Sequence, residues 1–73
     1  MASEYIIVGD TKDYNGCLVY TCGASKDLAR DVLNRMHTQP TAEDRRIMET
    51  HSNLRIEQVK SKDCLWNYPF LAN

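Results

Sequence analysis

The sequence predicts a small α+β domain, in which an antiparallel sheet of three to four strands carries two helices on one face in the order ββααββ. Three observations predict this fold class: apolar, β-branched runs near the N-terminus, two stretches with helical apolar spacing in the middle, and short strand-like runs after them. A chain of 73 residues is expected to form one domain, 1–73, with one thin hydrophobic core.

The first two strands are predicted at about residues 4–10 and 16–22. Residues 5–8 are continuously apolar, as in a strand that is covered on both faces. In the second strand the alternation of side chains predicts two uncharged faces, one with Leu18, Tyr20 and Cys22 and the other with Cys17, Val19 and Thr21. The pair Asn15-Gly16 between the two runs favours a hairpin.

Two helices are predicted next. The first begins after Ser25, a good capping residue, and is stopped by Gln39-Pro40. Its apolar residues recur on one stripe, namely Leu28, Ala29, Val32, Leu33 and Met36. The second helix starts at Thr41, which forms a capping-box pattern with Asp44. It has a shorter apolar face, with Ile47, Met48 and His51.

The C-terminal third predicts two more strands. Asn53 suits a left-handed exit from the second helix, and residues 54–57 alternate apolar with charged, as in a half-exposed strand. Val59 is out of phase with this alternation, which predicts a bulge near Glu57-Gln58 or an early end of the strand. A last strand is expected at 64–68, and Pro69 ends it or confines it to an edge.

Such a sheet has one face that the two predicted helices do not cover. Two short helices cover one side, whereas the first two strands are apolar on both sides. A patch of this kind is not normally left exposed on a monomer. We therefore expect either the aromatic C-terminal segment to fold back over it or a second molecule, such as another copy of the chain, to cover it.

The amino-acid composition excludes further classes of function. The 9 Lys and Arg residues against 10 Asp and Glu residues lack the basic excess that general nucleic-acid binding requires. No apolar run is long enough to cross a bilayer, and the N-terminus lacks a signal-peptide pattern, which predicts a cytoplasmic protein without membrane contact. Three cysteines, an odd number, are expected to be reduced thiols in the core.

The spacing of reactive residues disfavours metal sites, cofactors and catalysis. Cys17 and Cys22 stand at opposite parity on one strand and point to opposite faces, so they cannot share a zinc ion there. The polar loop matches only part of a calcium-binding pattern, because Cys22 occupies the place of the bidentate carboxylate. His37 and His51 fall near the C-termini of the predicted helices, where a histidine interacts favourably with the negative end of the helix dipole. Neither histidine forms a recognisable catalytic signature with a cysteine.

Two groups of residues are candidates for binding. The C-terminal aromatic segment alternates large side chains that could form either core or a recognition edge, and the loop after the first strand is polar. The candidate residues are Trp66, Asn67, Tyr68 and Phe70 in the first group, and Asp10, Asp13, Tyr14 and Asn15 in the second.

Four stretches, at residues 5–11, 14–20, 53–57 and 63–67, together resemble short uncharacterised proteins carried by bacterial phages and mobile elements. The resemblance implies a protein that inhibits or sequesters a host component, such as part of a defence system. It assigns no functional residue.

The prediction that follows is a non-catalytic binding module of this inhibitor type, whose partner is a host protein, a second copy of the chain, or both. The alternative is a homo-oligomer that holds a small ligand, such as a nucleotide signal, between subunits, with Asp10, Thr11, Asn15 and helix arginines as polar contacts. An enzyme with a cysteine nucleophile is the third hypothesis.

Overall fold

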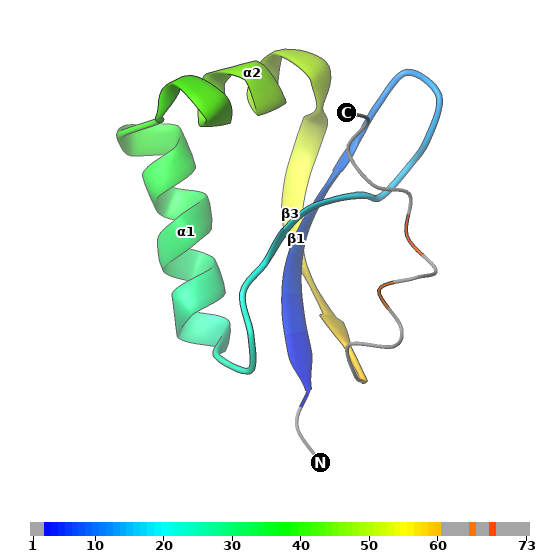
Figure 1. Cartoon of the computed structure of the whole chain (residues 1–73), viewed down its shortest axis with the longest axis vertical. Coiled ribbons are helices and arrows are strands. Elements are labelled where there is room, and N and C mark those ends of the chain that lie inside the picture. The colour runs from blue at the N-terminus through cyan, green and yellow to red at the C-terminus, as the bar shows by residue number, and fades with distance from the viewer. Residues whose placement is uncertain (1–2, 61–64, 66–67, 69–73) are drawn as a thin grey trace.

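The computed structural model describes residues 3–60, Leu65 and Tyr68. The elements follow the order β1 (Glu4–Asp10), β2 (Cys17–Thr21), α1 (Lys26–Thr38), α2 (Ala42–Thr50) and β3 (Ser52–Val59). The strands form an antiparallel sheet with the order β2-β1-β3. Both helices lie on the same side of this sheet (Figure 1). The predicted fold class is thus confirmed in its coarse form, as an α+β protein with a three-stranded antiparallel sheet and two helices.

The predicted order ββααββ is confirmed only as far as ββααβ. The predicted last strand, at 64–68, lies outside the described residues except for Leu65 and Tyr68, and neither of these two belongs to a strand. A fourth strand therefore does not extend the sheet within the described part of the chain.

The helices begin where their capping residues predict. The Ser25 hydroxyl accepts a hydrogen bond from the backbone N–H of Leu28 at 3.1 Å, at the start of α1. At the start of α2 the capping box is complete: the Thr41 hydroxyl accepts from the Asp44 N–H, and the Asp44 carboxylate accepts from the Thr41 N–H. These contacts satisfy N–H groups that a helix start leaves without a partner.

A bulge in β2 overturns the predicted division of its faces. Ile7 pairs with Tyr20 and Val8 with Leu18, so Val19 is an extra residue that has no partner on β1. The bulge changes the phase of the alternation: Val19, Tyr20 and Cys22 pack on the helix side, and Leu18 packs on the other side. The sequence pattern assumed a regular strand and therefore grouped Leu18 with Tyr20 wrongly.

A second bulge lies at the start of β3, not near Glu57-Gln58 as predicted. Val8 pairs with Arg55 and Asp10 with Ser52, which leaves Asn53 and Leu54 opposite Gly9 alone. Asn53 has the predicted left-handed conformation, with φ of 53°, but this residue lies inside β3 and not at the exit from the helix. The pairing from Arg55 to Val59 is regular, so Val59 simply faces the side away from the helices.

Hydrophobic clusters lie on both faces of the sheet. The cluster under the helices has a buried centre of Ile7, Cys22, Ala29, Met36 and Ile47. On the other face the buried residues are Ile6, Val8, Leu18 and Val59, with Leu65 and Tyr68 packed against them. Ile6 and Val8 have no exposed surface. Of the two expected covers for this face, the structure therefore supports the fold-back of the C-terminal segment, at least through these two residues.

Candidate functional site

The candidate site is the β1–β2 loop, residues 11–16, which stands at one end of the hairpin. A pair of residues closes its turn: the Thr11 N–H donates to the Tyr14 carbonyl at 2.7 Å, and the Tyr14 N–H donates to the Thr11 hydroxyl oxygen at 3.0 Å. These reciprocal bonds hold the backbone on both sides of Lys12 and Asp13. The loop thus has a defined shape that does not depend on a partner.

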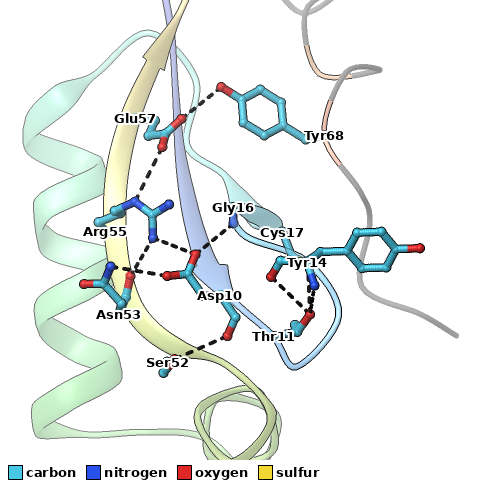
Figure 2. Close-up of polar contacts among 10 residues, drawn as sticks. All are labelled: Asp10, Thr11, Tyr14, Gly16, Cys17, Ser52, Asn53, Arg55, Glu57 and Tyr68. Carbon is cyan, nitrogen blue, oxygen red and sulfur yellow. Dashed lines mark hydrogen bonds and ion pairs between the residues drawn. The ribbon is translucent and has the colours of Figure 1, made fainter.

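Asp10, at the end of β1, ties the loop to the sheet (Figure 2). Its Oδ1 accepts from the Gly16 N–H at 2.9 Å and from Arg55 Nη1 at 3.1 Å, and its Oδ2 accepts from Asn53 Nδ2 at 3.4 Å. Gly16 has φ of +77°, a left-handed conformation that glycine adopts without strain. The hydrogen bond from Gly16 and then that from Arg55 lower the pKa of the Asp10 carboxyl group below its ordinary value.

The polar contacts continue from Asp10 across β3. Arg55 Nε lies 3.5 Å from Glu57 Oε2, and the Tyr68 hydroxyl donates to Glu57 Oε1 at 2.9 Å. Asp10, Arg55, Glu57 and Tyr68 therefore form one chain of contacts on the face opposite the helices (Figure 2). This chain connects the base of the loop to Tyr68, which packs against the hydrophobic cluster on that face.

Tyr14 is the exposed feature of the loop. Its side chain is 60% exposed, and its ring points away from the Asp10 contacts (Figure 2). Lys12, Asp13 and Asn15 around it are also exposed. The loop therefore presents one large aromatic side chain, surrounded by polar ones, on a backbone that internal hydrogen bonds hold in place.

The predicted site residues divide into four groups. Asp13, Tyr14 and Asn15 lie together in the loop, whereas the Asp10 carboxylate is engaged inside the protein. Tyr68 packs on the sheet and bonds to Glu57, so within the described part of the chain it serves the fold. Trp66, Asn67 and Phe70 lie outside the described residues.

Sequence reasoning missed the partners of Asp10. Arg55 and Glu57 were expected only as the exposed face of a half-buried strand, since charged residues alternate with apolar ones there. Their roles depend on the pairing of β1 with β3, which brings Arg55 opposite Val8 and within reach of Asp10. The one local signal was the alternation of apolar and charged residues, which indicated that Arg55 and Glu57 share a face.

A groove lies between α1 and the edge strand β2, with a volume of about 320 Å³. Its lining residues are Tyr20, Thr21, Cys22, Asp31, Val32 and Arg35. At its side the Tyr20 hydroxyl donates to Asp44 Oδ1 at 2.7 Å, and Arg35 Nη2 lies 3.3 Å from Asp44 Oδ2. These contacts connect β2, α1 and the start of α2.

The contact between Tyr20 and the buried Asp44 carboxylate is reflected in the pKa values of both groups. Desolvation, followed by the hydrogen bond to Asp44, raises the pKa of Tyr20 to about 12. Burial alone would raise the pKa of Asp44, but hydrogen bonds from Thr41 and Tyr20, together with the charge of Arg35, lower it below its ordinary value. Asp44 therefore stays ionised inside the protein although it is fully buried.

The described thiols are buried, and both histidines lie at the ends of helices. Cys17 and Cys22 are free and buried, as predicted, and burial raises the pKa of the Cys22 thiol, which disfavours the reactive thiolate. Cys64 lies outside the described residues. His37 lies in the last turn of α1 and His51 caps α2, as predicted. Among the described residues, no three His, Cys, Asp or Glu side chains are grouped so as to hold a metal ion.

The fold and the loop together define a small α+β protein that carries one exposed aromatic residue on an ordered hairpin loop. In the part of the chain that the structure describes, no helix has the length and apolarity needed to span a membrane. A scan against protein-family models, a search of curated proteins and a search of solved structures found no match for this chain.

Proposed function

We propose that this protein is a non-catalytic binding module that recognises a protein partner through Tyr14 at the tip of the β1–β2 loop. The observation that carries the proposal is the combination of an exposed aromatic ring with a backbone that is already ordered. Tyrosine provides a large contact area at a low cost in side-chain entropy, and it is enriched among the residues that dominate binding energy.

The contacts below the loop support the proposal. Binding normally loses free energy when a flexible loop is ordered. Here the Thr11–Tyr14 pair and the bonds of Asp10 to Gly16 and Arg55 hold the loop before a partner arrives. A partner therefore needs to supply only an apolar pocket for the ring, with a hydrogen-bonding group for the hydroxyl.

The same contacts make a nucleotide ligand at this loop less favourable. The Asp10 carboxylate and the Arg55 guanidinium neutralise each other, at 3.1 Å, so neither is available to a charged ligand. The raised pKa of Cys22 disfavours this thiol as a nucleophile. We further propose that the partner is a bacterial cytoplasmic protein that this chain inhibits, which is the role implied by the resemblance to phage proteins.

Variants at Tyr14 test the proposal. Wild-type protein is immobilised to capture a partner from a bacterial lysate, the partner is identified, and its Kd is then measured with purified variants. Tyr14→Ala should weaken binding by roughly 30-fold or more, since a central aromatic contact contributes about 2 kcal/mol. Tyr14→Phe, which keeps the ring, should retain most of the affinity.

Leu28→Ala is the matched control, because Leu28 is also a large exposed residue, at 50%, but lies on α1. It should bind as the wild type does. Equal affinity of Tyr14→Ala and the wild type would refute the role of the loop. If no protein is captured and a nucleotide instead raises the melting temperature, the small-ligand alternative replaces this proposal.

A further inference from the structure

The two edges of the sheet differ in how they are protected against pairing with another strand. Natural proteins commonly place charged residues on exposed edge strands, because open N–H and C=O groups otherwise pair with other chains. The edge strand β3 carries Arg55 and Glu57. By contrast, the edge strand β2 has the sequence Cys-Leu-Val-Tyr-Thr, with no charge and no proline. Within the described residues, β2 is thus the unprotected edge.

The backbone of β2 directs hydrogen-bonding groups toward its open side at Thr21. The Cys22 N–H donates to the Tyr5 carbonyl at 2.8 Å, so it points toward β1. Because successive residues of a strand point their backbone groups to opposite sides, the N–H and C=O of Thr21 point away from β1. Thr21 is also exposed, which leaves its backbone accessible to another strand.

The groove beside this edge has an apolar lining residue between two residues of opposite charge. Val32 of α1 lines the groove, and Asp31 and Arg35 flank it with opposite charges. Although Arg35 contacts Asp44, its side chain remains 46% exposed. A peptide of one charge would be attracted by one of these two residues and repelled by the other. A surface with the same two charges in reversed order would match both.

We propose that the occupant is a second copy of this chain, which pairs β2 with β2 in antiparallel orientation about a two-fold axis at Thr21. Such an interface is isologous, so each surface must complement itself. In this arrangement the N–H of each Thr21 donates to the C=O of the other. The two sheets of three strands join into one continuous sheet.

The same axis accounts for the helix charges. Thr21, the last residue of β2, stands between Tyr20 and Cys22 among the residues that line the groove, alongside the α1 segment from Asp31 to Arg35. A two-fold axis at this level makes the two α1 helices antiparallel, which brings Asp31 of each copy toward Arg35 of the other. The apolar groove is then covered by the partner's equivalent residues.

This interface is separate from the surface proposed to bind a partner protein. The β1–β2 loop precedes Cys17, at the other end of β2 from Thr21. In the dimer the two Tyr14 side chains are presented at opposite ends of the joined sheet, and both remain free. Tyr14→Ala should therefore leave the dimer intact, so that failure of one proposal can be distinguished from failure of the other.

Measurements of mass in solution test the dimer. Light scattering or sedimentation of the full chain should give about twice the mass of the 8.4 kDa chain. Thr21→Lys should reduce this to the mass of one chain with an unchanged circular dichroism spectrum, because a lysine on an edge strand opposes pairing. Gln58→Lys, the matched control at an exposed residue of the β3 edge, should remain dimeric.

Cross-linking locates the axis. Paired residues of antiparallel strands have Cα atoms about 5.5 Å apart, within the range that a disulfide spans. Thr21→Cys should therefore form a disulfide dimer on oxidation, through residue 21 of both copies, and Gln58→Cys should not. A monomeric wild type at all concentrations up to about millimolar would overturn the proposal, as would a dimer that Gln58→Lys dissociates and Thr21→Lys does not.

Discussion

At the scale of single residues, the chain is closely packed where β1 meets the start of β3. Gly9 stands opposite the bulge at Asn53, and a Cβ atom there would lie 2.7 Å from Leu54 Cδ2 and 3.0 Å from His51 Cβ. The His51 ring is held beside it, with Nδ1 3.0 Å from the Ile47 carbonyl oxygen. The absence of a side chain at Gly9 therefore allows the chain to pass directly from α2 into the sheet.

Gly9→Ala should lower the free energy of unfolding by about 1–3 kcal/mol, because an added methyl group in a packed region forces its neighbours to move. Chemical denaturation of the variant and the wild type measures the difference. Gly23→Asn is the control: no atom lies within 4 Å of a Cβ at Gly23, and asparagine tolerates its φ of +71°. Equal stability of Gly9→Ala and the wild type would contradict the packing described.

At the scale of elements, Asp44 is the residue that joins three of them. Its carboxylate caps α2, accepts from Tyr20 of β2 and pairs with Arg35 of α1. Leaving a buried carboxylate oxygen without its donor is unfavourable, more so than losing an exposed hydrogen bond. The contact of Tyr20 with Asp44 therefore contributes to the position of α2 on the sheet.

Tyr20→Phe removes one hydroxyl group and keeps the ring. We expect it to lower the free energy of unfolding by about 1–3 kcal/mol, because Asp44 Oδ1 loses the hydrogen bond from Tyr20 in a buried position. Urea denaturation at neutral pH measures this change. Tyr14→Phe, which removes an exposed hydroxyl, should be neutral within about 0.5 kcal/mol, and a similar loss in both variants would show that burial of Asp44 is not the cause.

At the scale of the whole molecule, the shifted carboxyl and hydroxyl groups define the pH range of stability. The folded-state pKa values of Asp10 and Asp44 are lowered, so their contribution is present above the unfolded value of about 4 and is lost as the pH falls further. The pKa of Tyr20 is raised to about 12, so its contribution is complete below about pH 10 and is lost as the pH rises toward 12.

Unfolding free energy measured as a function of pH should therefore show a plateau between about pH 5 and 9, with a decline on each side. The Tyr20→Phe variant should lose part of the alkaline decline, since it has no hydroxyl to titrate at that position. It should keep the acid decline that Asp10 causes. An unchanged alkaline decline in Tyr20→Phe would show that Tyr20 does not cause it.

The amino-acid sequence by itself determined the local features of this protein. Ser25 and Thr41 mark the starts of α1 and α2, Asn15-Gly16 marks the hairpin, and the apolar runs mark β1 and β2. These signals depend on residues within about four positions of each other, through capping bonds, turn conformation and side-chain periodicity. Tyr14 was identified as a candidate for the same reason, as part of a polar hairpin loop.

The tertiary structure alone decided which residues meet across the sheet. The bulge at Val19 put Leu18 and Tyr20 on opposite faces, a second bulge placed Asn53 and Leu54 opposite Gly9, and the pairing of β1 with β3 brought Arg55 to Asp10. The Tyr20–Asp44 hydrogen bond likewise joins residues 24 positions apart. One extra residue in a strand reverses every side chain beyond it, and its position depends on packing with distant segments, which no local pattern encodes.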